Sequence, residues 1–198
     1  KEKFDLLVIA LSLPGIDFIA KKLKDEKIKT PILVLTKGLK YISKNKKILT
    51  ISENLKRNSG VKNVSVLKGP CLAKELARKN QTSVVIANKS INFAKKIGKR
   101  ISTKYYITEF SKDVVGVEVC SAIKNIYSMI IGAGQSLNAS SNLFQKSIKE
   151  MIFLTKYLKG KEETALGLAG VGDLYVSAAG GRNSKMGSYL GKGYTFKI

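Results

Sequence analysis

Residues 115–125 read V-G-V-E-V-C-S-A-I-K-N, an apolar stretch that ends in a lysine and an asparagine. Apolar residues recur at helical spacing from 115 to 130, and this periodicity predicts a buried helix. Between Val114 and Ile131 the only charged residues are Glu118 and Lys124, in a protein in which 25% of the residues are charged. Because lysine is rarely buried without a partner, Lys124 either extends its amine to the surface or points it into a cleft. In a cleft, desolvation lowers the pKa of the amine and lets it serve as a proton donor.

The composition around this stretch is that of a globular protein. With 198 residues, 44% of them hydrophobic, the chain is long enough for one or two domains with a sizeable core. No apolar run approaches the roughly 18 residues of a membrane span. The longest candidate, 126–134, is far too short, so we expect no integral membrane association. The first residues, K-E-K-F-D, do not resemble a signal peptide, and we expect a cytoplasmic protein.

The net charge of +22 is compatible with nucleic acid, an anionic membrane or anionic small molecules as partners. All but four of the 36 basic residues are lysines, and they are scattered over what we predict to be solvated faces. Nucleic-acid readers depend on arginine forks and stacked aromatic rings. Because neither is concentrated here, we expect no specific nucleic-acid partner.

Histidine is absent, which excludes Ser-His-Asp and Cys-His catalysis and histidine-ligated metals. The two cysteines, Cys71 and Cys120, are far apart in apolar contexts, as reduced thiols of an intracellular protein would be. We therefore expect no metal site. Any acid-base chemistry must use Lys, Asp, Glu or Tyr.

The first 110 residues alternate between apolar runs and amphipathic segments, which predicts a mostly parallel α/β sheet. We expect the first strand to be buried on both faces, and the first helix, opened by Pro14, to carry Ile16, Phe18, Ile19 and Leu23 on one side. The expected strands are 5–11, 31–36, 64–67, 83–87 and 104–107, and the other expected helices are 51–58, 71–79 and 91–100.

From Asp113 onward the patterns become helical, with segments at 114–131, at 141–159 capped by Gly160, and at 184–190. The sequence thus predicts an incomplete Rossmann-like α/β domain, 1–112, followed by an all-α substrate domain, 113–198. Ligands of such sheets bind beyond the carboxyl ends of the strands, where Lys37-Gly38 and Gly69-Pro70 are expected. No strand is followed by the Gly-rich turn G-x-G-x-x-G of dinucleotide-binding domains.

Two glycine-rich segments near the C-terminus carry further candidates, G-L-A-G-V-G-D-L at 167–174 and S-A-A-G-G-R-N-S-K at 177–185. Arg182 and Asn183 precede the short helix, and a guanidinium beside helix N-terminal amides suits a phosphate. Each signal is weak alone. G-G-R-N is more often a polar turn, Asp173 more often an N-cap, and Lys37 an ordinary strand-end lysine.

Together these segments resemble the bacterial type of NAD(P)-dependent glycerol-3-phosphate dehydrogenase. They occur in the family's order and cover almost the whole chain from Asp5. The resembling segments are L-T-K-G-L (35–39), I-S-E-N-L (51–55), G-P-C-L-A-K-E-L-A (69–77), V-G-V-E-V-C-S-A-I-K-N-I-Y (115–127), E-T-A-L-G-L-A-G-V-G-D-L (163–174) and G-R-N (181–183).

The resemblance implies reversible hydride transfer between NAD(P)H and dihydroxyacetone phosphate, giving sn-glycerol 3-phosphate for phospholipid synthesis. It makes Lys124 the proton donor and acceptor at the substrate oxygen, and it leaves room for a homodimer. It implies that Asp173 orients Lys124 or a substrate hydroxyl, and that Ser177 matches a site hydroxyl. The implied substrate contacts are Lys37, Gly69, Cys71, Lys124, Asp173, Gly181, Arg182 and Asn183, and the implied cofactor contacts are Lys37, Ala73 and Arg182.

The sequence departs from the family in several places. Cys71 stands where the bacterial enzymes usually have Thr or Ser, Gln81 replaces a Pro, and Cys120-Ser121 replaces a smaller pair. The first βαβ unit, with its Gly-rich turn and its ribose selector, is missing before Lys1, and the C-terminal helices look cut short. We therefore expect a fragment with impaired activity, and the sequence does not choose between NAD and NADP.

Two alternatives remain open. A sister 3-hydroxyacid or 6-phosphogluconate-type dehydrogenase also places a Lys-Asn pair on the first helix of its second domain, although G-G-R-N with G-L-A-G-V-G-D-L argues against it. The second alternative is a non-enzymatic basic protein that binds anions.

Overall fold

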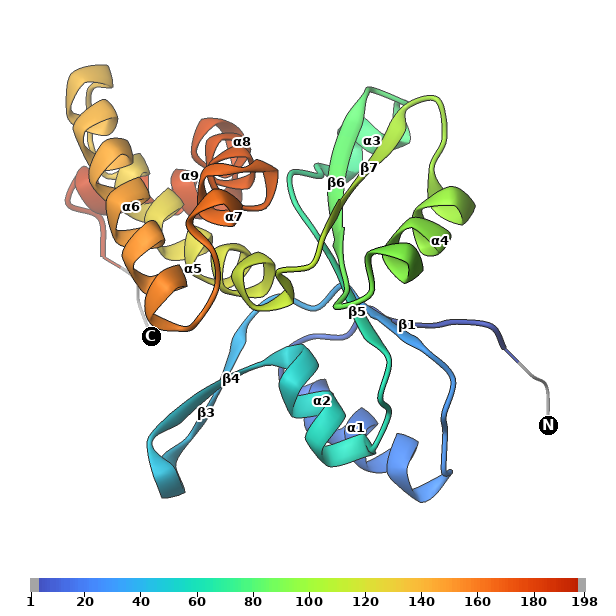
Figure 1. The fold of residues 1–198 in the computed structure, drawn as a ribbon. Helices are drawn as coiled ribbons and strands as arrows, with labels where there is room; N and C mark the ends of the chain where they lie inside the picture. Colours follow the sequence, from blue (N-terminus) through green and yellow to red (C-terminus); the bar gives the residue numbers. More distant parts are fainter. Residues whose placement is uncertain (1–3, 196–198) are drawn as a thin grey trace.

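A five-stranded mixed sheet forms the first part of the protein in the computed structural model, which describes residues 4–195 (Figure 1). Its strand order is β1-β2-β5-β6-β7, and three of the four pairings are parallel, while β5 and β6 run antiparallel. The expected mostly parallel α/β sheet is thus confirmed. The strands are β1 (Leu7–Ile9), β2 (Ile32–Val34), β5 (Val64–Lys68), β6 (Thr82–Ala87) and β7 (Tyr106–Ser111).

Helices cover both faces of this sheet. Buried side chains of α1 (Gly15–Asp25) and α2 (Ile51–Ser59) pack with β1, β2 and β5 on one face. On the other face, α4 (Ile91–Ile101) packs against β2 and β6. The short α3 (Ala73–Ala77) follows β5 and is shorter than the predicted 71–79.

Two apolar side chains that were predicted to be buried are exposed. Val8 is 57% exposed, because β1 is at the edge of the sheet described here and pairs with β2 alone. Phe18 is exposed too, because α1 buries Ile16, Ala20 and Leu23, and a residue two positions after Ile16 points away from that face. The apolar character of Phe18 alone does not determine which face of α1 it lies on.

An antiparallel hairpin formed by β3 (Leu39–Ile42) and β4 (Lys47–Thr50) was not predicted. Its turn places Lys46 in the left-handed region at φ 50°, where glycine or asparagine is the usual signal. The last strand was also misplaced, since β7 runs to Ser111 and pairs in parallel with all of β6.

The second part is helical, as predicted, and lies to one side of the sheet in Figure 1. Its elements are α5 (Val114–Gly132), α6 (Leu137–Tyr157), α7 (Glu162–Leu166), the π-helical turn η2 (Leu168–Gly172), α8 (Asp173–Gly180) and α9 (Arg182–Gly191). Gly160 is not the cap of α6. The cap is Leu158, and Lys159 takes the left-handed conformation (φ 71°) in a Schellman motif, in which the Gly160 amide donates to the Thr155 carbonyl.

Helix α5 is the axis of the helical part and packs against α6, α8 and α9 as well as β5. It is the one helix among residues 4–195 that is long and apolar enough to cross a membrane. The search for unbroken apolar runs did not predict this, because Glu118 and Lys124 interrupt the helix. Most of it is buried inside the protein, as in the core helix of a soluble domain. Of the predicted apolar stripe, Ile126 and Ile130 are exposed instead.

A buried carboxylate anchors α5 to the sheet side of the molecule. Glu118 is 2% exposed and accepts hydrogen bonds from the backbone amide of Ser52, at 3.0 Å, and from the Ser52 hydroxyl. Ser52 lies in the first turn of α2, where free amides favour an anion. Burial raises the pKa of Glu118, while the Ser52 hydrogen bonds and the charge of Lys68 oppose that rise.

Ser121 offers a test of the packing around α5, because its buried hydroxyl has no hydrogen-bond partner within the described part of the chain. We expect Ser121→Ala to raise the free energy of unfolding by about 1 kcal/mol, since it removes an unsatisfied polar group. Urea denaturation measures the change. Ser128→Ala is the matched control on the same helix. The Ser128 hydroxyl donates to the Asn125 carbonyl at 3.0 Å, so its loss should destabilise. Equal destabilisation by both substitutions would contradict the prediction.

Candidate functional site

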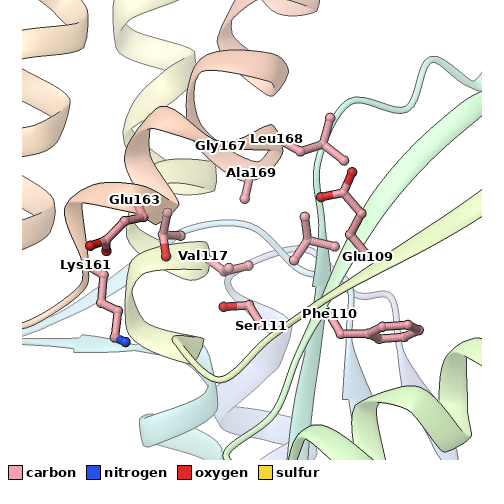
Figure 2. A pocket seen from close by; sticks show the side chains of 11 residues that line it. Glu109, Phe110, Ser111, Val117, Lys161, Glu163, Gly167, Leu168 and Ala169 are labelled. Carbon is pink, nitrogen blue, oxygen red and sulfur yellow. The ribbon is translucent and has the colours of Figure 1, made fainter.

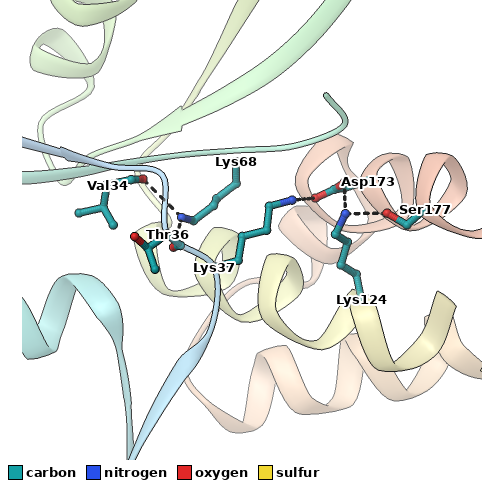
Figure 3. A network of polar contacts seen from close by, with 7 residues as sticks. All are labelled: Val34, Thr36, Lys37, Lys68, Lys124, Asp173 and Ser177. Atoms are coloured by element: carbon teal, nitrogen blue, oxygen red, sulfur yellow. Dashed lines mark hydrogen bonds and ion pairs between the residues drawn. The ribbon is translucent and has the colours of Figure 1, made fainter. Parts of the chain in front are cut away.

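The amine of Lys124 is buried and bound to two groups of α8 (Figure 3). Its Nζ lies 2.5 Å from Asp173 Oδ1 and 2.6 Å from Ser177 Oγ. Asp173 and Ser177 are four residues apart and therefore share one face of α8. With Lys124 7% exposed and Asp173 2% exposed, the alternative in which this lysine extends to the surface is excluded.

A second lysine reaches the same carboxylate from the sheet. Lys37 follows β2, and its Nζ donates to Asp173 Oδ2 at 3.0 Å (Figure 3). Each oxygen of Asp173 thus binds one ammonium, one from the sheet and one from α5. The Lys37 side chain is 35% exposed, so its amine is the more accessible of the two. The carboxylate joins three elements that are distant in sequence.

The environment of Lys124 changes its acidity. The pKa of its amine is lowered to about 8, chiefly by burial; the charge of Asp173 opposes this shift, and the nearby charge of Lys37 contributes to it. A donor with a pKa near neutrality gives and regains a proton easily. Lys124 therefore has the placement and the acidity of a general acid and base.

The glycines before Asp173 serve packing. Gly170 lies in η2, and a Cβ there would approach the Ala165 carbonyl oxygen to 2.0 Å. The π-helical turn carries the chain from α7 into α8, so that Asp173 becomes the first residue of α8, capped by Gly172. The N-cap interpretation of Asp173 is therefore wrong, since its carboxylate binds lysines and not helix amides.

The segment Gly181–Asn183 follows directly. The Gly181 amide donates to the Ser177 carbonyl at 3.0 Å, and a Cβ at Gly181 would come within 2.3 Å of that oxygen. The helix α9 begins at Arg182 and not at Ser184, so Arg182 and Asn183 form its first turn. Arg182 is exposed, and within residues 4–195 its guanidinium has no hydrogen-bond or ion-pair partner. This turn lies next to Ser177, one of the two groups that bind Lys124.

The segment after β5 lies at the same sheet edge as Lys37, because β2 and β5 are parallel neighbours. Gly69 has φ +118°, and a Cβ there would meet the backbone of Val84 at 3.3 Å. Cys71 and Ala73 are exposed beside it. The part of Cys71 that faces the protein is desolvated, and this partial desolvation raises the pKa of its thiol despite the opposing charge of Lys37, so the thiol stays protonated at neutral pH. No contact in the described part of the chain joins Gly69 or Ala73 to Lys124.

One residue of this network was missed. Lys68 is 2% exposed, and its Nζ donates to the carbonyl oxygens of Thr36, at 2.5 Å, and of Val34, at 3.3 Å (Figure 3). A signal existed, since two buried strands both lead into Lys-Gly, at 37–38 and 68–69.

A pocket of about 330 Å³ opens nearby, between β6–β7 and the segment from α7 to η2 (Figure 2). Neither Lys37, Lys124 nor Asp173 lines it. Its charged groups are Glu109, Glu163 and Lys161, a balance that disfavours an anionic ligand. Within residues 4–195 no group of His, Cys, Asp and Glu side chains is arranged to hold a metal ion. The lysine cluster on Asp173 is therefore the candidate site.

Comparison with known proteins gives a consistent result over nearly the whole chain. Residues 1–94 match the family model described as NAD-dependent glycerol-3-phosphate dehydrogenase N-terminus, and residues 113–198 match the corresponding C-terminus model. The NADP(+)-dependent glycerol-3-phosphate dehydrogenase of Archaeoglobus fulgidus is 35% identical over an aligned length of 193, and the alignment covers 91% of this chain and 56% of that protein. The glycerol-3-phosphate dehydrogenase [NAD(P)+] of Clostridium botulinum is 32% identical over an aligned length of 199, and the alignment covers 97% of this chain and 59% of that protein.

Solved structures agree. The crystal structure of glycerol-3-phosphate dehydrogenase from Coxiella burnetii superposes with a TM-score of 0.86 at 28% identity, over 96% of this chain and 59% of that one. The structure of the Dunaliella salina protein gives 0.86 at 24% identity, over 95% of this chain and 33% of that one, and supports the fold alone. The chain thus spans less than two thirds of the length of these relatives.

Removal of the shared carboxylate is a direct test of the cluster. We expect Asp173→Asn to lower the free energy of unfolding at pH 7 by about 3 kcal/mol, because it leaves the buried Lys124 ammonium unpaired. The pKa of Lys124 is lowered from 10.5 to about 8 in the folded protein. Above pH 8 the folded state therefore releases this proton before the unfolded chain does. The decrease in the free energy of unfolding caused by Asp173→Asn should then become smaller as pH rises toward 10.

Urea denaturation of both proteins at pH 7 and pH 9.5 measures the effect. Glu162→Gln, which removes the exposed ion pair with Lys156 (2.9 Å), is the control and should change little. A loss for Asp173→Asn no larger than that of the control, or one that grows with pH, would contradict the assignment.

Proposed function

Because the chain belongs to the NAD-dependent glycerol-3-phosphate dehydrogenase family, we propose that it carries the substrate side of an enzyme that transfers a hydride between NAD(P)H and dihydroxyacetone phosphate. The product is sn-glycerol 3-phosphate, a precursor for phospholipid synthesis. The observation that carries this proposal is the pair of ammoniums, Lys37 and Lys124, held on the two oxygens of Asp173.

Lys124 is the proposed acid. When a hydride adds to C2 of the ketone, the C=O π electrons move to oxygen, and the resulting alkoxide takes a proton from the Lys124 ammonium. The lysine is left neutral, which the pKa of about 8 makes accessible, and it recovers its proton before the next turnover. Asp173 and Ser177 hold the amine in place, and Lys37 supplies a second cation that stabilises the developing oxyanion.

The phosphate end of the substrate is assigned to the start of α9. Arg182 has a free guanidinium within the described residues, and Asn183 lies beside it in the first helical turn. Helix N-terminal amides and a guanidinium are the groups that bind phosphate well. The close packing of Gly181 on Ser177 connects this turn to the reacting end of the site.

The described residues also fit one side of a nicotinamide cofactor. The sheet edge beside Lys37 carries the turns at Gly38 (φ +133°) and Gly69 (φ +118°), and the cluster has more positive than negative charge, as a phosphate-bearing cofactor needs. Lys37, Ala73 and Arg182 are the residues proposed to contact it. NAD(P)H, when bound, supplies the hydride.

Several coarser features belong to the same proposal. We propose a division into an α/β domain, 1–112, and a helical domain, 113–198, and the end of β7 at Ser111 and the start of α5 at Val114 support it. We propose a cytoplasmic enzyme with a small phosphorylated substrate, no specific nucleic-acid partner and no integral membrane association. A homodimer is the proposed assembly.

Substitution of Lys124 tests the mechanism in the full natural chain that contains residues 1–198. We expect Lys124→Met to lower kcat for dihydroxyacetone phosphate reduction by about 100-fold or more, because the proton donor is lost. In the unsubstituted enzyme, reduction should slow as pH rises through about 8, where Lys124 loses its proton, and glycerol 3-phosphate oxidation should accelerate over the same range.

Absorbance measures both directions, as NAD(P)H consumption with dihydroxyacetone phosphate and as NAD(P)H formation from NAD(P)+ with glycerol 3-phosphate. Lys156→Met, at an exposed lysine paired with Glu162, is the control and should retain activity. Full turnover by Lys124→Met would refute its role. Turnover with a 3-hydroxyacid or 6-phosphogluconate, and none with dihydroxyacetone phosphate, would assign the chain to a sister dehydrogenase.

A further inference from the structure

Lys68 is a buried cation without a contacting carboxylate among the described residues. It is the last residue of β5, and its ammonium donates to the carbonyl oxygens of Val34 and Thr36 at the carboxyl end of β2. The carboxylate with the largest electrostatic influence on Lys68 is Glu118, which is already bound to Ser52. Burial lowers the pKa of Lys68 to about 8.

Such a group is costly for the fold. An ammonium that has been removed from water and paired with carbonyl oxygens alone recovers only part of its lost hydration. A leucine or methionine would end a buried strand at lower cost, as apolar residues do elsewhere in this sheet. The position of Lys68 therefore suggests a role in addition to stability.

The bonds of Lys68 converge on the peptide from which Lys37 extends. The Thr36 carbonyl belongs to the same peptide unit as the Lys37 nitrogen, and the Thr36 hydroxyl is fixed separately by a 2.7 Å bond to the Leu11 carbonyl. Gly38 then turns the chain with φ +133°. The backbone on both sides of Lys37 is thus constrained, which limits the directions that its long side chain can take.

Electrostatic interactions favour the same orientation of the Lys37 side chain as these backbone constraints do. The ammoniums of Lys68 and Lys37 repel, since the charge of Lys37 contributes to the lowered pKa of Lys68, whereas Asp173 attracts both. In Figure 3 the Lys68 amine lies at the β2 end of the network, and Lys37 extends from there toward Asp173 and Ser177. Repulsion by Lys68 and attraction by Asp173 both favour the extended conformation of Lys37.

We propose that Lys68 is a positioning residue, which binds the Val34 and Thr36 carbonyls, fixes the peptide that carries Lys37, and so holds the Lys37 ammonium on Asp173. The geometric part stands on the contacts described above. The consequence for turnover rests on the proposed function, in which Lys37 contacts the substrate.

Crystal structures of three variants of the full natural chain test the geometry. In Lys68→Met the Lys37 ammonium should leave Asp173, so that the 3.0 Å contact is lost. In Lys68→Arg, which keeps donors for both carbonyls, the contact should persist. Lys56→Met removes a half-buried lysine of α2 that has no bond to β2, and it should also keep the contact. A Lys37–Asp173 contact that is unchanged in Lys68→Met overturns the proposal. If Lys68→Met does not fold, Lys68→Ala, which lacks both the charge and the donors, takes its place with the same two outcomes.

A double-mutant cycle tests the consequence for turnover. Lys68→Met should lower kcat/KM for dihydroxyacetone phosphate by about 10- to 100-fold, and Lys68→Arg should restore most of it. In a Lys37→Met background the further substitution of Lys68 should change kcat/KM little, because the group through which it acts is gone. Additive losses overturn the proposal. If the unsubstituted enzyme does not reduce dihydroxyacetone phosphate, the proposed function fails, and the crystal structures alone decide the role of Lys68.

Discussion

The carboxylate of Asp173 is shared by two ammoniums that arrive from opposite parts of the protein. Lys37 extends from the end of a sheet strand, Lys124 from the central helix α5, and Asp173 itself begins α8. Two ammoniums bound to the same carboxylate would repel each other strongly in a medium of low dielectric constant. The negative charge of Asp173 offsets this repulsion, and the arrangement of the site depends on it.

This balance also explains how an anionic ligand would be attracted. Asp173 offsets one positive charge, whereas Lys37, Lys68 and Lys124 carry three when protonated, so the cluster retains positive charge that an anionic ligand would offset. The net charge of +22 is spread over the protein and does not by itself locate a binding site. Buried charges that few other groups compensate locate it, because solvent screens them least.

The packed helix α5 carries Lys124, the acid that we propose. At one end of the buried stretch Glu118 binds the first turn of α2, and fewer than two turns later Lys124 reaches α8. The same helix is therefore fixed to the sheet side and to the helical side of the molecule. A group mounted on a packed helix keeps its direction better than one on a loop, which is what proton transfer over a short distance requires.

Some of this organisation is local and could be predicted from the sequence. The alternation of apolar strands and amphipathic helices gave the sheet, and the apolar run around Lys124 gave the buried helix, because periodicity depends on residues close together in the chain. The motifs around 37, 69–77, 115–127 and 163–183 gave the family, since their order and length are themselves sequence properties.

What only the tertiary structure decided depends on contacts between distant residues. Asp173 is 136 positions from Lys37 and 49 from Lys124, so periodicity pairs neither lysine with it. The family resemblance indicated the contact with Lys124, whereas the contact with Lys37 is visible only in the folded chain. The exposure of Val8 follows from its edge strand, and the role of Lys68 follows from two carbonyls 32 and 34 residues earlier. Periodicity reports which face of an element is apolar, but the element packed against that face, and hence the partner of each buried charge, is fixed by the folded chain.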